Sequence, residues 1–332
     1  MSHFMSDTGS EDGLAQAHLH GLAHALGHRK SHLAESETAG LLESSAVDLL
    51  SSGFAWHYRC EDDQSAYDLA LAAVRALPEG SLADGADAII YSTCLPGNGN
   101  IGTAETWRSS RDVRHLMEFP ASHLQAELEL DRAVVIGLTQ QGCTGFLGSL
   151  RLASSLLASE PEWERVLCVT ADRFPPGSVY EQSFNLISDG AAACVVARSP
   201  GTFRILGTHH ITNGGMAAAT GEESIGSYFS YTQLLVRETL RRTGLTMADI
   251  DWIVPQNTNA AAWKILSRML GIDENQVHMP SLPESAHAIS SDHAINLSDL
   301  TASGRLRKGQ RVMLLVAGHG LNWQSTVLEV TA

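Results

Sequence analysis

Cys143 lies where a nucleophile is expected. The segment VVIGLTQQGCTGFLGSLRLASSLL begins as a β-rich run and becomes helical at Thr144 or Gly145, so the cysteine precedes a helix N-terminus. The backbone N–H groups and the dipole at such a terminus favour a thiolate, the nucleophilic form of cysteine. Gly142 and Gly145 permit close backbone approach on either side. The alternative is an ordinary buried cysteine that packs as a small hydrophobic residue.

A second polar group, Gln256, Asn257, Thr258 and Asn259, follows a short apolar run and precedes a predicted helix. The carboxyl edge of the sheet is where α/β proteins bind ligands, so these side chains are candidates for a binding site. Asn259 would support that site or simply cap the following helix.

Lys264 and Arg268 lie four residues apart on one face of that helix, with Trp263 beside them. The two cations could bind a phosphate group of a substrate. A solvent-exposed helix face is the more common explanation of the same pattern. We therefore treat all three as weak candidates for substrate binding.

His287, Asp292 and His293 fall within seven positions of the segment PESAHAISSDHAINLSDL. A histidine with a nearby carboxylate has the parts of a general base and of the group that orients it. Each histidine alone would more often be a surface residue or a hydrogen-bonded core residue.

Gly318, His319 and Gly320 form a turn between two apolar runs. Glycines there allow backbone N–H groups to face a neighbouring site, where they could stabilise an oxyanion. His319 is a further weak candidate for substrate binding. An ordinary tight hairpin would explain the same residues.

Four histidines, His20, His24, His28 and His32, recur every four residues. On a helix they would line one face and could bind a metal. Two glycines make a helix poor here, and the alternation in LHGLAHALG favours a strand. We expect no metal site.

The composition describes a folded protein with an acidic surface. The 332 residues are 44% hydrophobic and 18% charged, with a mean hydropathy of −0.04. A net charge of −15 disfavours nucleic acid and anionic membranes as partners. Five cysteines without a CxxC pair argue against a disulfide framework or a zinc ribbon.

The N-terminus predicts a flexible tail over residues 1–15, because these residues are polar and acidic. They lack the basic and apolar parts of a signal peptide, and no apolar run reaches the roughly 18 residues of a membrane helix. We expect a cytoplasmic protein.

Beyond the tail, helical and strand patterns alternate along the chain, which predicts α/β layers around a buried sheet. Residues 16–200 and 201–332 look alike in outline, since each half runs from a strand through a polar turn into a helix. The helices are expected at 65–77, 145–158, 228–242 and 260–270, and the strands at 86–92, 132–138, 165–171, 191–197, 252–255, 311–317 and 325–330.

In this order the segments resemble the thiolase-fold β-ketoacyl-acyl carrier protein synthase III family. Gly142–Phe146 is similar to the family's Ala-Cys-Ser-Gly-Phe, Asp189–Ala191 matches Asp-Gly-Ala, and Gly318–Trp323 is similar to Gly-Gly-Gly-Leu-Thr-Trp. The resemblance implies an α/β fold of five layers, αβαβα, with two similar halves, and a homodimer. The N-terminal half would carry the nucleophile, and the C-terminal half the base and the oxyanion turn.

Two positions depart from the pattern of decarboxylating members. Gln256 stands where they have the histidine of Pro-His-Gln-Ala-Asn, and His287 stands where they have the asparagine of Gly-Asn-Thr-Ser. Glutamine can hydrogen-bond a carbonyl but cannot usefully exchange a proton at neutral pH. A divergent subgroup is similar in having Gly-His followed by Ser-Asp, which fits His287, Ser291 and Asp292.

The resemblance and the departures together predict an acyltransferase. Cys143 would take an acyl group from acyl-CoA or an acyl carrier protein, whose phosphopantetheine thioester is substrate rather than cofactor. His287 would activate a small-molecule acceptor, as in secondary metabolism. Two alternatives stay open: a carbon–carbon condensing enzyme, decarboxylating or not, in which Gln256 polarises the thioester carbonyl, and a catalytically silent partner subunit.

Overall fold

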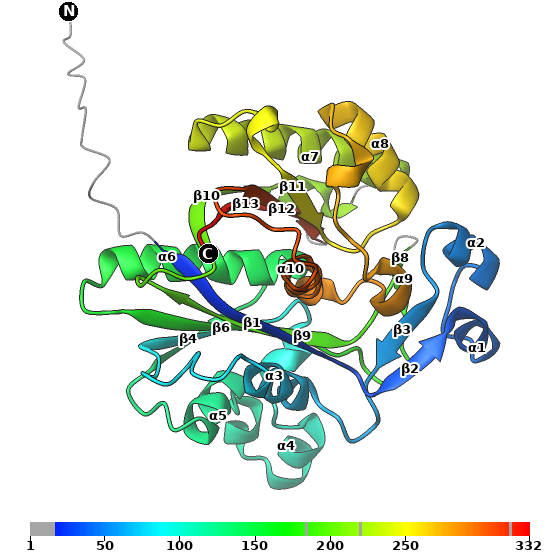
Figure 1. Cartoon of the computed structure of the whole chain (residues 1–332). Helices are drawn as coiled ribbons and strands as arrows, with labels where there is room; N and C mark the ends of the chain where they lie inside the picture. The colour runs from blue at the N-terminus through cyan, green and yellow to red at the C-terminus, as the bar shows by residue number, and fades with distance from the viewer. Residues whose placement is uncertain (1–16, 183–184, 219–220, 319–320) are drawn as a thin grey trace, which may run out of the picture.

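The computed structural model describes residues 17–182, 185–218, 221–318 and 321–332 (Figure 1). These residues form a large sheet of nine strands in the order β11-β12-β13-β10-β1-β9-β6-β4-β5. Its strands are β1 (His18–Leu26), β4 (Ala88–Ser92), β5 (Val134–Leu138), β6 (Arg165–Asp172), β9 (Gly190–Ala197), β10 (Phe203–Thr212), β11 (Trp252–Pro255), β12 (Arg311–Gly318) and β13 (Asn322–Val330). Two small hairpins pair β2 (Arg29–His32) with β3 (Trp56–Arg59) and β7 (Glu181–Gln182) with β8 (Asn185–Leu186).

Strand β1 joins two parts of the sheet. It pairs with β9 from His18 to Leu26 but with β10 only at His18 and Leu19. In the part β5-β4-β6-β9-β1, the first three strands are parallel and the others antiparallel. In the part β11-β12-β13-β10, the first two are parallel and the others antiparallel. In both parts, the strands are parallel at the outer edge of the sheet and antiparallel toward its middle.

The helices lie in three layers around these two parts (Figure 1). Helices α3 and α5 cover one outer face, α7 and α8 cover the other, and α6 and α10 lie between the two parts of the sheet. This arrangement confirms the predicted αβαβα fold. The helices are α1 (Leu33–Thr38), α2 (Ala46–Ser51), α3 (Ala66–Arg75), α4 (Ala104–Ser110), α5 (Pro120–Glu127), α6 (Gly145–Ser159), α7 (Gly221–Thr243), α8 (Ala260–Leu270), α9 (Leu282–Ser285) and α10 (Asp292–Ala302).

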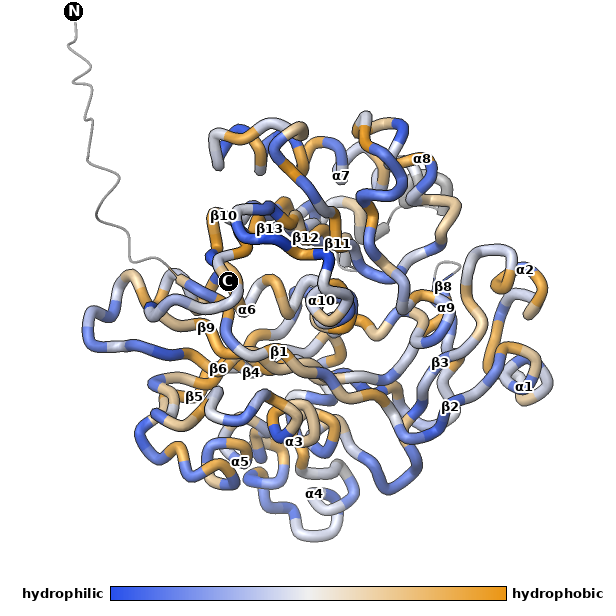
Figure 2. Tube along the Cα trace, in the orientation of Figure 1, coloured by the Kyte–Doolittle hydropathy of each residue, from blue (hydrophilic) through white to orange (hydrophobic). Residues whose placement is uncertain are grey.

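The middle layer explains why α6 begins inside the protein. Residues 142–150 are all buried, and they are small or apolar on every side of the helix. A helix that packs against two sheets has no face left for solvent, which this composition satisfies. Figure 2 shows the hydrophobic residues concentrated along β9, β6 and β4, next to this helix. The nucleophile candidate that precedes α6 therefore lies deep in the molecule.

Most sequence predictions of secondary structure are confirmed. The strand at 252–255 and the helix at 260–270 have the predicted ends, and LHGLAHALG lies in β1 except for its last residue, Gly27. Within the described ranges, no three His, Cys, Asp or Glu residues lie close enough together to hold a metal ion. Nor does any helix of these ranges have the length and apolar character needed to span a membrane.

Two predictions of chain organisation stay predictions. Residues 1–15, the expected tail, lie outside the described residues. The division at residue 200 falls between β9 and β10. The hairpin of β2 with β3 and the strand β10 were not predicted. All residues of β10 except Phe203 are half-buried or exposed, without an apolar alternation to mark the strand.

Candidate active site

Cys143 lies in a 3₁₀ turn, Gly142–Thr144, that connects β5 to α6. Only 5% of its surface is exposed. Gln140 and Gly142 have φ angles of 65° and 55°, so the chain turns sharply through left-handed conformations before the helix begins. Gly318, at the end of β12, packs against this turn, because a Cβ atom there would lie 2.9 Å from the backbone nitrogen of Cys143. The close contact requires glycine at position 318.

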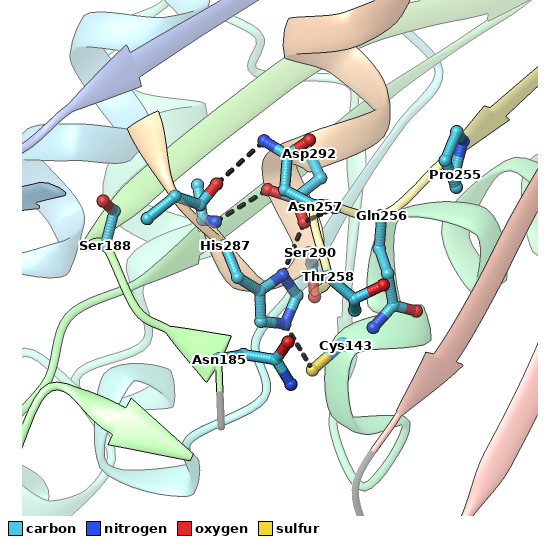
Figure 3. A network of polar contacts seen from close by, with 12 residues as sticks. Cys143, Asn185, Ser188, Pro255, Gln256, Asn257, Thr258, His287, Ser290 and Asp292 are labelled. Atoms are coloured by element: carbon cyan, nitrogen blue, oxygen red, sulfur yellow. Dashed lines mark hydrogen bonds and ion pairs between the residues drawn. The ribbon is translucent and has the colours of Figure 1, made fainter. Parts of the chain in front are cut away.

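His287 links the Cys143 thiol to a carboxylate (Figure 3). Its Nε2 lies 3.3 Å from Cys143 Sγ, and its Nδ1 lies 2.5 Å from Asp292 Oδ2. Because Nδ1–H donates to the carboxylate, Nε2 is the nitrogen that faces sulfur. All three residues are buried. The structure thus brings together the three residues predicted to be the nucleophile, the base and the group that orients the base.

Three hydrogen bonds hold the Asp292 carboxylate. Oδ2 accepts from the backbone N–H of Asn257 at 2.7 Å as well as from His287, and Oδ1 accepts from the backbone N–H of Ala288 at 2.7 Å. Asp292 is also the first residue of α10, where a negative charge is favoured by the helix dipole. The carboxylate is therefore fixed before any substrate binds.

The electrostatics of His287 differ from those of an isolated general base. Burial disfavours the imidazolium, but the Asp292 carboxylate and Cys143 outweigh burial and raise the pKa of His287 well above its ordinary value. The raised pKa favours the imidazolium form of His287, and an imidazolium beside sulfur stabilises a thiolate. His287 must give up a proton before it can accept one.

The backbone around His287 is strained and firmly held. Ala286 has a φ angle of 51° and a ψ angle of −152°, a region in which residues with a Cβ atom are disfavoured by roughly 1–3 kcal/mol. Hydrogen bonds fix the segment: His287 N–H donates to Leu186 O at 2.9 Å, and Ser188 N–H donates to His287 O at 2.9 Å. The imidazole therefore has one position relative to Cys143.

The junction between β11 and α8 supports the site mainly as a scaffold. Gln256 Oε1 accepts from the backbone N–H of Ala317, and Figure 3 shows the amide nitrogen on the side of Cys143. Asn257 is fully buried; its Nδ2 donates to Ser281 Oγ and Ala286 O, both at 2.8 Å, and its Oδ1 accepts from Asn296 at 2.8 Å.

Asn259 caps α8 and also supports a neighbouring side chain. Its Oδ1 accepts from Ala261 N–H, and its own N–H donates to Asn185 Oδ1, each at 2.9 Å. The capping alternative therefore describes its side chain. Asn185, on β8, was not predicted, because only the folded chain brings it next to Asn259.

The structure separates the three weak candidates on α8. Trp263 is only 3% exposed and packs in an apolar cluster with Ile253 and Leu266, so its assignment to substrate binding is corrected to the core. Lys264 and Arg268 lie on the opposite, exposed face of the helix. The amphipathic period of α8 explains the difference, since Trp263 belongs to its apolar stripe.

Two further predictions concern neighbouring residues. His293 is completely buried, and its Nε2 lies 3.0 Å from Leu315 O, which leaves it in the core rather than at the thiol. His319 and Gly320 lie outside the described residues, so of the expected glycine turn only Gly318 can be placed.

A cavity of about 450 Å³ adjoins Cys143, within the range of roughly 300–1,000 Å³ that suits small molecules. Its lining residues are Cys94, Leu95, Gln140, Gly142, Cys143, Phe174, Gln182 and Ile289. A larger hollow, of about 560 Å³, lies at the start of β1 and includes neither Cys143 nor His287. The smaller cavity is the candidate substrate site, because it contains the predicted nucleophile.

Cys94 is the neighbour of Cys143 that the sequence did not reveal. It follows β4, half-buried, and lines the same cavity as Cys143. Asp172 fixes the turn that carries it, accepting from Thr93 Oγ1 at 2.7 Å and from Cys94 N–H at 2.8 Å. Burial raises the pKa of Asp172 to about 6. No local motif marks these residues, since about 50 positions separate the two thiols in the chain.

Comparison with known proteins gives consistent results. The family model described as 3-oxoacyl-[acyl-carrier-protein] synthase III matches residues 139–214, and the model of its C-terminal region matches residues 240–330. The chain is 27% identical over 309 residues to the synthase III 3 of Streptomyces coelicolor, covering 83% of this chain and 86% of that protein. It is 25% identical over 232 residues to the synthase III of Rickettsia bellii, covering 63% and 71%.

A solved structure shares the fold. The acyltransferase ChlB3 superposes with a TM-score of 0.78 at 19% identity, over 96% of this chain and 98% of that one. An identity this low shows the fold alone.

Proposed function

Because this chain belongs to the 3-oxoacyl-[acyl-carrier-protein] synthase III family, we propose that it transfers acyl groups through a thioester on Cys143. The observation that carries the proposal is the hydrogen-bonded series from Cys143 Sγ through His287 to Asp292. A thiol paired with a protonated imidazole is an activated nucleophile. The same series favours a catalyst over the silent-subunit alternative, because all three of its members are present and in contact.

In the first half-reaction, the Cys143 thiolate attacks the carbonyl carbon of an acyl thioester. The carbon–sulfur bond to the donor then breaks, and the departing thiolate takes the proton from His287 Nε2. This order follows from the raised pKa of His287, which makes the imidazolium available as an acid in the resting site. The products are acyl-Cys143, a free donor thiol and a neutral imidazole.

In the second half-reaction, the neutral His287 is a base. It accepts a proton from the acceptor, whose nucleophilic atom attacks the thioester carbonyl and releases the Cys143 thiolate. Asp292 stabilises the imidazolium that forms again and keeps Nε2 directed at the reacting atoms. The Gln256 amide nitrogen, and backbone N–H groups near Gly318 and Gly320, are our candidates for donors to the carbonyl oxygen.

We propose acyl-CoA or an acyl carrier protein as the donor, a small molecule as the acceptor, no cofactor besides the acyl thioester, and a cytoplasmic role in secondary metabolism.

We also propose a homodimer. Strand β5 ends the sheet, and its Val134 and Val135 are 48% and 37% exposed. An apolar edge strand is a surface that a second copy would cover. A monomeric mass in sedimentation equilibrium would contradict the dimer.

Carbon–carbon condensation is the second candidate, because the family is defined by a synthase activity. The acceptor would then be a carbanion, stabilised by its own thioester. Gln256 offers an amide donor but no proton exchange in place of the family histidine, which is why we rank plain acyl transfer first.

The nucleophile is tested by intact-protein mass spectrometry with a panel of acyl-CoA and acyl carrier protein thioesters. We expect one acyl group per chain on the parent protein and none on Cys143→Ala. Cys60→Ala is the matched control, since Cys60 is half-buried but lies outside the cavity, and it should acylate like the parent. Acylation of Cys143→Ala would refute the mechanism, and a parent protein that no thioester labels would support the silent subunit.

A further inference from the structure

Two pairs of thiols in this protein have opposite surroundings. Cys94 and Cys143 both line the substrate cavity. Cys168 and Cys194 face each other across the antiparallel strands β6 and β9, but both are completely buried. Only the first pair can be reached by a small molecule that enters the cavity.

The two thiols of the cavity pair also differ from each other. Cys143 has the His287 imidazole 3.3 Å from its sulfur. The hydrogen bond with Cys143, burial and the Asp172 carboxylate hold the pKa of Cys94 above its ordinary value. A small oxidant therefore reacts first at Cys143, because the thiolate is the species that is oxidised.

We propose that Cys94 is a resolving thiol, which converts oxidised Cys143 into a reversible Cys94–Cys143 disulfide. The inference goes beyond the proposed function, since it concerns protection and control of the nucleophile rather than acyl transfer. Cys94 is suited to this role by position: Asp172 fixes the backbone that carries it, and it lines the same cavity as Cys143.

The chemistry balances with hydrogen peroxide as the oxidant. Cys143 sulfur attacks one peroxide oxygen, the O–O bond breaks, and the products are a sulfenic acid and hydroxide, which is protonated to water. Cys94 sulfur then attacks the sulfenic sulfur. The S–S bond forms, the S–O bond breaks, and the hydroxyl group leaves with the Cys94 proton as a second water.

The disulfide removes the nucleophile, so acylation should stop until a reductant restores both thiols. Cys94 is the other cysteine among the described residues that line this cavity, so without it further peroxide should carry Cys143 to the sulfinic and sulfonic acids. Those states are not reversed by simple thiol reductants. The second thiol therefore makes oxidation of this site recoverable.

The full-length protein tests this directly. After treatment with hydrogen peroxide and alkylation of the remaining thiols, peptide mass spectrometry should identify a Cys94–Cys143 link, with the intact mass lowered by two hydrogen atoms. Dithiothreitol should reverse the link. The readout is covalent, so it is independent of whether the acyl-transfer proposal holds.

Two variants sharpen the test. In Cys94→Ala, we expect Cys143 to gain two or three oxygen atoms and dithiothreitol to restore none of it. Cys94→Ser is the second variant, to be used if Cys94→Ala folds poorly. Cys60→Ala should behave like the parent. A link between Cys168 and Cys194, no link in the parent, or full recovery of the Cys94 variants would each overturn the proposal.

Discussion

Two junctions in this protein have the same order of elements, but their side chains have different surroundings. In each, a strand runs into a polar turn and then a helix: β5 leads through Cys143 to α6, and β11 leads through Gln256–Asn259 to α8. At the first junction, the Cys143 side chain faces a cavity and an imidazole. At the second, the three amide side chains each hydrogen-bond to backbone or buried side-chain groups. The topology places both junctions, but the partners of the side chains decide which is reactive.

The largest expected effect tests whether the first junction is reactive through its partner. His287→Ala removes the acid of the first half-reaction and the base of the second, so transfer from acyl-Cys143 should slow by about 100-fold or more. Quenched-flow mass spectrometry can follow acyl-Cys143 as it forms and decays. His123→Ala, at an exposed histidine, is the control. Parent-like decay in His287→Ala would show that the base lies elsewhere.

The next effect tests whether the second junction is a scaffold. Asn257→Ala removes three buried hydrogen bonds, to Ser281 Oγ, Ala286 O and Asn296 Nδ2, and a buried polar group left unsatisfied costs about 1–3 kcal/mol. We expect the free energy of unfolding in urea to fall by about 2 kcal/mol or more. Asn275→Ala, at an exposed asparagine, should stay within about 0.5 kcal/mol of the parent. If Asn257→Ala were as stable as the parent, the second junction would not act as a scaffold, and the contrast between the two junctions would be wrong.

A pH series isolates the charge at the first junction. In Cys143→Ala, His287 keeps Asp292 as its partner, so we expect its pKa to stay above the value of about 6.5 in the unfolded chain. The imidazolium then stabilises the fold fully below pH ~6.5, and this stabilisation is lost as the pH rises through the folded pKa.

Urea unfolding between mildly acidic and alkaline pH measures this effect. The unfolding free energy of Cys143→Ala should fall with rising pH relative to that of Cys143→Ala/His287→Gln, by at most about 1.4 kcal/mol per pH unit. A difference that does not change with pH would mean that the histidine is neutral in the folded protein.

The smallest effect concerns chemistry added to the second junction. Gln256→His restores the residue type of decarboxylating relatives, and an imidazole nitrogen can still accept from Ala317 N–H. We expect unchanged acylation of Cys143 and a modest rise in carbon dioxide released from malonyl thioesters, measured with labelled substrate against the parent. Rapid release by the parent itself would favour the condensing alternative.

Local patterns were enough to predict most of the large elements and the three residues that the fold brings together around Cys143. The ends of β11 and α8 follow from an apolar run, a proline and a cap, and Cys143, His287 and Asp292 each stand out by residue type and neighbours. The family resemblance added the pairing between the two halves, because nothing in either segment says that positions 143 and 287 meet.

What the sequence did not reveal depends on distant contacts. Asp172 and Cys94 reach Cys143 only because β4 and β6 pair in parallel and end at the same edge of the sheet. Trp263 was wrongly assigned to substrate binding, because the sequence around a tryptophan beside two cations is the same whether its side chain faces solvent or the core. The protonated state of His287 needs the burial and the distances that only the fold supplies.

The central place of β1 sets the order in which the protein can form during synthesis. β1 is the first described strand to leave the ribosome, yet its partners β9 and β10 follow about 170 residues later. At roughly 5–20 residues per second, that delay is on the order of 10–30 seconds. During this time both edges of β1 are unpaired, and unpaired edges invite association with other chains. The described strand that is made first thus waits through the longest stretch of synthesis for a partner in the large sheet.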